Sequence, residues 1–236
     1  MRPIGVFFTF MMWAALPGAA LARAPVVVEL FTAQGCSACN TVGASIAKLA
    51  ARPGLIVLTW SVDYWDYLGW TDTSAKPEFT RRQRAYEHRL GHRDVYTPQV
   101  IIAGRVEAAG DKPAEMDAAI RKARHARVRP PEMTFTSTGK LSIGPGRRPR
   151  GGAEVWLVRY DPRPVTVLVK AGDNRGASVS QRDDVRQLVR LGAWSGRRVT
   201  FKLPSPPEDG LATAALIQGA RGGPVLSAAA VLETMK

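Results

Sequence analysis

The sequence predicts an α/β protein in which strands and helices alternate over the first half and short strands dominate the second half. Three observations support this prediction. Apolar runs of strand length alternate with helical apolar spacing between residues 26 and 123. The two cysteines of the chain stand in a CxxC motif between the first strand and the first helix. Beyond residue 129, short apolar runs are separated by turns rich in Gly, Pro and Asp.

The first half begins with a predicted strand–helix–strand unit. Val26–Phe31 is an almost continuous apolar run, as expected for a buried strand, and residues 40–51 carry apolar side chains at helical spacing. Pro53 and Gly54 end that helix, and Leu55–Trp60 is a second buried-strand run. Because strand–helix–strand connections are normally right-handed crossovers, we expect the two strands to be parallel.

Two further helices and a hairpin complete the first half. Pro77–Leu90 is predicted to be helical, with Gly91 as its stop. Gln99–Ala103 and Val106–Ala109 indicate a hairpin, and Asp111 is predicted to cap the last helix. The predicted order is β-α-β-α-β-β-α, which is the order of the thioredoxin fold. That fold keeps its redox centre where this chain has its CxxC motif.

The second half is predicted to be a β-rich, sandwich-like domain. Pro130 and Pro131 mark the boundary, which gives a thioredoxin-like domain over residues 23–129 and a β-rich domain over residues 130–236. A short helix is also considered over residues 183–191. The strand candidates are residues 133–137, 141–143, 153–160, 165–170, 199–203, 211–218 and 225–228.

Residues 1–22 have the pattern of a signal peptide. Arg2 precedes an apolar stretch over residues 4–16, residues 17–18 are Pro-Gly, and residues 20–22 form a small-x-small cleavage motif. A retained membrane anchor is the weaker alternative because the apolar stretch is too short to span a bilayer comfortably. We therefore expect an exported protein with no transmembrane anchor after cleavage.

The chain of 236 residues has a formal net charge of +13, supplied mostly by arginine. Its densest basic stretches lie at residues 121–129 and 147–150. No aromatic residues alternate with these cations and the protein is predicted to be exported, so we expect no nucleic-acid partner. The alternatives are a basic surface that faces anionic envelope components and a simple arginine-rich coding bias.

Cys36-Ser37-Ala38-Cys39 has the layout of a thiol–disulfide redox site. The start of a helix favours a thiolate, so Cys36 is predicted to be an exposed nucleophile and Cys39 a partly covered resolving thiol. The alternative is a purely structural disulfide. A bridge across two residues closes so small a loop, however, that it would add little stability.

Thr97 and Pro98 precede the predicted third strand. In a thioredoxin-like fold this position holds a cis-proline that faces the disulfide. We therefore expect a cis bond here, although an ordinary trans proline is the commoner arrangement. The cis bond would bring the Thr97 backbone beside Cys36, where it can pair with a substrate strand.

Four aromatic residues and two carboxylates lie between the second strand and the next helix. They are Asp63, Tyr64, Trp65, Asp66, Tyr67 and Trp70. Because the second strand ends on the same face as the CxxC motif, one hypothesis is a substrate rim in which Asp63 or Asp66 takes a proton. The other, held equally, is an aromatic plug that packs on the domain.

Three other polar residues need an explanation. Glu29 interrupts a buried strand and is expected at a surface edge or in a salt bridge, with a proton acceptor beneath the disulfide as the weaker alternative. His88 and His92 have a metal-ligand spacing, but Gly91 separates them and no third ligand is evident. We therefore predict no metal site and no cofactor.

Several of these motifs together resemble the domain-of-unknown-function 1223 family. The segments that carry the resemblance are Val28–Cys39, Val62–Trp70, Arg82–Tyr86 and Val95–Gln99. The resemblance covers about residues 26–230 and implies a thioredoxin-like fold and Gram-negative export, to the periplasm or the medium. It implies no particular activity. One departure is Asn40-Thr41, where family members often have prolines after the second cysteine.

The CxxC motif, the element order and Thr97-Pro98 together predict a thiol–disulfide oxidoreductase. Its partner would be a thiol- or disulfide-containing protein or a small thiol. The alternative is a non-catalytic envelope-binding protein whose disulfide only shapes a loop. A copper-handling protein is a weaker third hypothesis, since thiolates suit soft copper but no histidine lies nearby.

Overall fold

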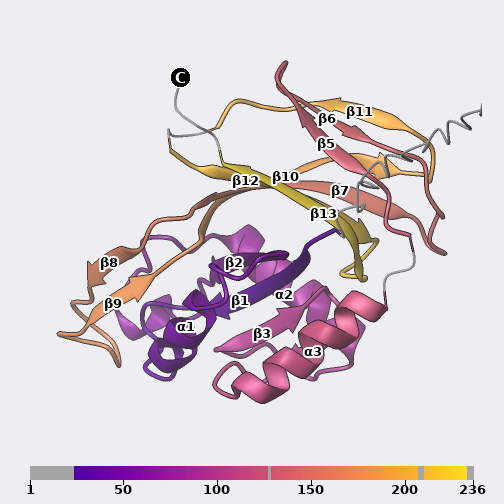
Figure 1. Cartoon of the computed structure of the whole chain (residues 1–236). Coiled ribbons are helices and arrows are strands. Elements are labelled where there is room, and N and C mark those ends of the chain that lie inside the picture. Colours follow the sequence, from indigo (N-terminus) through magenta and orange to yellow (C-terminus); the bar gives the residue numbers. More distant parts are fainter. Residues whose placement is uncertain (1–23, 127–128, 207–209, 233–236) are drawn as a thin grey trace, which may run out of the picture.

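The computed structural model describes residues 24–126, 129–206 and 210–232 (Figure 1). The predicted signal peptide lies outside these residues. Within the described ranges, none of the helices is both long enough and apolar enough to cross a membrane.

The first half has the predicted order β-α-β-α-β-β-α, with one added 3₁₀ turn. Its elements are β1 (Val26–Thr32), α1 (Cys39–Ala47), β2 (Leu55–Ser61), η1 (Asp66–Leu68), α2 (Pro77–Leu90), β3 (Gln99–Ile102), β4 (Val106–Ala108) and α3 (Pro113–His125). The expected parallel pairing of β1 with β2 is confirmed. β3 pairs antiparallel with both β1 and β4.

The helix ends follow their local chemistry with two corrections. α2 begins at Pro77 and is capped by Gly91 at a φ of 78°, as predicted, because proline fits a first helical position and glycine accepts the left-handed cap. Asp111 does not cap the last helix. The N-cap is Lys112, and Pro113 opens the helix. α1 ends at Ala47, earlier than the apolar spacing suggested.

The second half is made of strands within its described residues. They are β5 (Met133–Thr136), β6 (Lys140–Ile143), β7 (Ala153–Asp161), β8 (Val165–Leu168), β9 (Ser178–Gln181), β10 (Asp184–Trp194), β11 (Val199–Lys202), β12 (Ala212–Gly219) and β13 (Val225–Leu232). The helix considered over residues 183–191 is wrong, since β10 occupies residues 184–191. β10 shifts its register with β7 at two irregularities, so its apolar residues do not alternate as in a regular strand.

One mixed sheet of eight strands joins the two halves. Its order is β13-β12-β7-β10-β2-β1-β3-β4, with four strands from each side of the predicted boundary at residues 129–130. The join is narrow, because β10 meets β2 in parallel through the single pair Asp184 and Thr59. The second half therefore extends the sheet of the first half, and does not build a sandwich from its own strands alone.

The large sheet is covered on both faces in its first half. Val26, Val28 and Leu30 of β1 face the core beneath α1 and α3, whereas Val27 and Phe31 face the core beneath α2. This alternation gives three layers, helix–sheet–helix (Figure 1). In the second half, the small sheet β11-β6-β5 packs over β7, β10 and β12 around the buried side chain of Trp194.

The hairpin β8–β9 lies apart from both of these sheets. It leaves the large sheet after β7, forms its own two-stranded sheet and returns to β10. Figure 1 shows it beside α1, and β9 contacts that helix. A segment from late in the sequence is thereby brought next to the CxxC motif.

Candidate functional site

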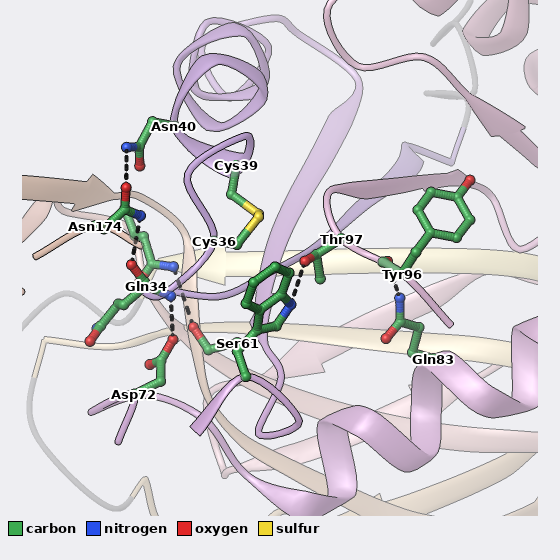
Figure 2. The surroundings of a disulfide bond; sticks show 12 residues. Gln34, Cys36, Cys39, Asn40, Ser61, Asp72, Gln83, Tyr96, Thr97 and Asn174 are labelled. Atoms are coloured by element: carbon green, nitrogen blue, oxygen red, sulfur yellow. Dashed lines mark hydrogen bonds between the residues drawn. A yellow bond between two sulfur atoms is a disulfide. The ribbon is translucent and has the colours of Figure 1, made fainter. Parts of the chain in front are cut away.

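The two cysteines form a disulfide at the start of α1 (Figure 2). Their Cα atoms are 5.4 Å apart. The amide of Cys36 donates to the Ala33 carbonyl at 3.1 Å, and the amide of Cys39 donates to the Cys36 carbonyl at 3.2 Å. These two turns carry the chain from β1 into the helix, so Cys36 lies in the loop and Cys39 is the first residue of α1.

The predicted exposure of Cys36 is wrong. Cys36 is 1% exposed and Cys39 is 3% exposed, whereas Ser37 and Ala38 between them are exposed. Both cysteines belong to the apolar core beneath α2, against which Tyr64 and Trp65 pack. The aromatic stretch after β2 therefore packs on the same core as the disulfide, and a partner must displace some of the surrounding structure to reach sulfur.

The Thr97-Pro98 bond is cis, as predicted. The hydroxyl of Thr97 accepts a hydrogen bond from Trp65 Nε1 at 2.8 Å. A Cβ atom added to Gly35 would lie 3.8 Å from Trp65 Cβ, so the same tryptophan also borders the CxxC loop. Trp65 therefore connects the loop before Cys36 with the segment before β3.

The aromatic stretch packs in part as the plug hypothesis predicts, and its role as a substrate rim stays a prediction. Trp65 and Trp70 are half-buried and donate their ring N–H groups to protein acceptors, as a plug would. Tyr64 is also half-buried, and burial raises its pKa to about 12. Tyr67 is instead 81% exposed and could contact a partner.

The two carboxylates of this stretch hold local structure. Asp63 accepts a hydrogen bond from the Thr80 hydroxyl at 2.6 Å, which ties the end of β2 to α2. Asp66 accepts from the amide of Asp72 at 3.1 Å. Proton transfer by either carboxylate stays a prediction.

Gln34 is a hydrogen-bonding centre that the sequence reasoning missed. It is 1% exposed. Its amide donates to Asp72 Oδ2 at 2.7 Å, and its side chain donates to Thr73 Oγ1 at 2.9 Å and accepts from Trp70 Nε1 at 3.0 Å. Its carbonyl accepts from Asn174 at 2.8 Å. The loop before Cys36 is thus fixed on two sides.

Asn174 supplies the second of these anchors from the loop between β8 and β9. It is 5% exposed, and besides the bond to Gln34 its Oδ1 accepts from Asn40 Nδ2 at 3.4 Å. Figure 2 shows Asn174 between Gln34 and Asn40. The same loop borders the aromatic stretch, since a Cβ atom on Gly172 would lie 3.5 Å from Leu68 Cβ. No local sequence signal marks this residue, because its partners are more than a hundred positions away.

Three buried carboxylates lie near Gln34 and at the start of β10: Asp72, Asp183 and Asp184. Burial raises the pKa of Asp72, whose oxygens accept from the amides of Gln34 and Ser74. Burial also raises the pKa of Asp184 to about 6 and that of Asp183 to about 7. The Ser74 hydroxyl donates to Asp184 Oδ2 at 2.6 Å.

Glu29 lies in a buried ion pair, so one of its two expected placements is confirmed. Arg82 Nε donates to its carboxylate at 2.6 Å, and the carboxylate side chain is 0% exposed, which makes the surface edge wrong. The Tyr86 hydroxyl donates to the second oxygen. Gln218 of β12 accepts from Arg82 at 3.1 Å. This network ties β1, α2 and β12 together across the two halves.

The histidines lie on or just after helices of the first half, with His88 in α2 and His125 in α3. His92 lies beyond the end of α2 and pairs with Glu107 at 2.8 Å. Within the described ranges, no group of three or more His, Cys, Asp or Glu side chains is placed to hold a metal ion.

A comparison with protein families settles the suspected relationship. The model of the family described as a protein of unknown function, DUF1223, matches residues 27–218. The chain belongs to the DUF1223 family. No curated protein sequence matches this DUF1223 chain.

Two solved structures resemble this DUF1223 protein. The crystal structure of protein AGR_C_4864 from Agrobacterium tumefaciens is 32% identical, with a TM-score of 0.73, and the match covers 92% of this chain and 99% of that one. HBP35 of Porphyromonas gingivalis is 15% identical, with a TM-score of 0.54, over 91% of this chain and 79% of that one. The second likeness concerns the fold alone.

Proposed function

We propose that this DUF1223 protein is an exported thiol–disulfide oxidoreductase with a thioredoxin-like first half. The observation that carries the proposal is the disulfide at the N-terminus of α1, with Cys39 as the first residue of that helix. The strand order β2-β1-β3-β4 and the cis bond at Thr97-Pro98 support it. A disulfide also fits a location outside the cytosol, where cysteine pairs are normally oxidised.

The proposed reaction is a two-electron exchange. A thiolate of the partner attacks Cys36 Sγ, the bond between the two cysteines breaks, and Cys39 leaves as a thiolate near the amides of the first turn of α1. A second partner thiolate then attacks the mixed disulfide and releases Cys36 as a thiolate. The partner becomes a disulfide and this protein a dithiol, and the reverse sequence reduces a partner disulfide.

Trapping of the mixed disulfide tests the proposal. Cys39→Ser keeps the nucleophile and removes the resolving thiol, so incubation with oxidised glutathione should give a stable adduct on Cys36, visible by intact mass. Cys36→Ser is the matched control and should form the adduct far more slowly. Equal rates for both variants, no faster than for an ordinary free thiol, would contradict the proposed role of Cys36.

The second candidate is a non-catalytic binding protein with a structural disulfide. The near-complete burial of both cysteines favours it. Tyr67 and Tyr96, which are 81% and 42% exposed, would then supply contacts to the ligand. In this case Cys36→Ser would leave binding intact and the native disulfide would resist exchange.

A further inference from the structure

A groove runs between the outer side of α1 and strand β9, and neither the thiol exchange nor the aromatic stretch uses it. Its volume is about 530 Å³, which lies within the range typical of small-molecule sites. It is lined by Asn40, Gly43, Ala44, Ala47, Lys48, Pro164, Ser178, Ser180, Gln181 and Arg182. We propose that this groove binds a small anion that carries two or more carboxylate or phosphate groups.

The small side chains of α1 create the space. Gly43, Ala44 and Ala47 form the helix wall of the groove. A Cβ atom added to Gly43 would meet nothing within 4 Å, so the wall is open at its centre. The hairpin β8–β9 forms the opposite wall, and Asn174 fixes its loop to the chain before α1. The groove is therefore held open between two anchored elements.

The side chains that line the groove are positively charged or neutral, which favours an anionic ligand. Lys48 stands at the C-cap of α1 and Arg182 follows β9, so each wall contributes one cation. None of the described residues that line the groove is acidic. Arg182 Nε pairs with Asp183 Oδ2 at the long distance of 3.8 Å. Cations on both walls favour a ligand with more than one anionic group.

Polar groups along the groove complete the recognition. Asn40 lies in the first turn of α1, at the positive end of the helix dipole, and the Lys48 ammonium stands at the opposite, negative end, which its charge offsets. The exposed hydroxyls of Ser178 and Ser180 offer further hydrogen-bond donors on the β9 wall. The side-chain amide of Gln181 donates one N–H to Ser61 Oγ at 3.3 Å and has a second N–H to offer. An anion would thus meet two charges and several neutral donors, and the net charge of +13 would attract it from a distance.

The inner end of the groove approaches the redox pair. A smaller cavity of about 20 Å³ shares Asn40, Gly43 and Arg182 with the groove and is lined also by Cys39. The groove therefore lies on the Cys39 side of the disulfide. Trp65, which is hydrogen-bonded to Thr97, instead borders the CxxC loop at Gly35. Anion binding there requires no thiol chemistry and stands independently of the proposed oxidoreductase activity.

Calorimetric titration of the oxidised mature protein tests the inference, with citrate and inorganic pyrophosphate as separate probes at equal, low ionic strength. Saturable 1:1 binding of at least one probe is expected. A preference for citrate assigns the site to carboxylates, and a preference for pyrophosphate assigns it to phosphates. Lys48→Gln and Arg182→Gln should each weaken binding by about tenfold, the loss expected for one charge-assisted hydrogen bond.

Lys170→Gln is the matched control, because Lys170 is an exposed cation of the same hairpin region that does not line the groove. It should leave the affinity unchanged. Ala44→Leu should block the groove and abolish binding while circular dichroism and the melting temperature remain those of the parent protein. The inference is overturned if neither probe saturates, or if Lys170→Gln weakens binding as much as the two groove variants.

Discussion

Trp65 packs near the disulfide and also connects two segments of the chain around it. It packs on the core that contains Cys36 and Cys39, and its ring N–H reaches Thr97. The sequence is compatible with an aromatic substrate rim and with a packed aromatic plug, and it does not distinguish the two. The choice depends on where each ring N–H finds an acceptor, and for Trp65 that acceptor lies 32 positions away.

Trp65→Phe should keep most of the packing and remove the hydrogen bond to Thr97. We expect a loss of about 1 kcal/mol in unfolding free energy and faster reduction of the disulfide by dithiothreitol. Urea denaturation and stopped-flow reduction measure the two effects. Tyr67→Phe, at an exposed position of the same stretch, should change neither. A reduction rate equal to that of the parent would show that Trp65 does not restrict access to sulfur.

Glu29 and Arg82 form a buried ion pair whose loss should be costly. Glu29→Gln leaves the buried guanidinium without its countercharge, so unfolding free energy should fall by about 3 to 5 kcal/mol. Asp117→Asn removes the carboxylate of an exposed pair with Arg52 and should have no measurable effect. Chemical denaturation of both variants gives the comparison, and equal effects would contradict the structural importance of the buried network.

At the scale of elements, those set by interactions between neighbouring residues were predicted well, and those set by distant contacts were not. α2 was predicted to its exact ends because Pro77 and Gly91 act locally. A short helix was only considered over residues 183–191, where β10 lies, because two register shifts against β7 disturb the alternation of that strand. The contact between the β8–β9 loop and the CxxC loop could not be predicted, because no local pattern records a partner 140 positions away.

Asn174→Ala should free the β8–β9 loop from the CxxC loop. The variant leaves the buried carbonyl of Gln34 without its donor, which should cost about 1 to 3 kcal/mol. Hydrogen exchange at residues 34–40 should become faster, and the disulfide easier to reduce. Asp173→Ala, at the exposed neighbouring position, is the control. Unchanged exchange in Asn174→Ala would mean that the hairpin does not support the site.

At the scale of the whole molecule, the halves share one large sheet, and the strand pair that joins them within that sheet carries buried acids. β10 joins β2 through Asp184, and Asp183 precedes it in a left-handed conformation with a φ of 55°. The strands of the second half were largely predicted from their apolar runs. Their membership of one sheet was not, because strand pairing is set by long-range packing that leaves no local pattern.

The two acids should make stability depend on pH. Burial raises the pKa of Asp183 to about 7 and of Asp184 to about 6, so the folded chain holds these protons more tightly than the unfolded chain. Their stabilising contribution is present in acid and is lost as the pH rises through about 6 to 7. Urea denaturation should therefore show falling stability between about pH 4 and pH 7.

Asp183→Asn should reduce this dependence and stabilise the protein above pH 7 by on the order of 1 kcal/mol. Asparagine suits the test because it tolerates left-handed backbone better than most residues. If the pH profile of the variant runs parallel to that of the parent, Asp183 does not hold its proton more tightly in the folded chain.

The reduction potential of the Cys36–Cys39 pair tests the proposed function most directly, by equilibration of the mature protein with glutathione buffers. The proposal predicts a value between about −120 and −270 mV, the range of thiol–disulfide exchange proteins. A value below about −300 mV is that of a structural disulfide and would contradict the proposed oxidoreductase activity.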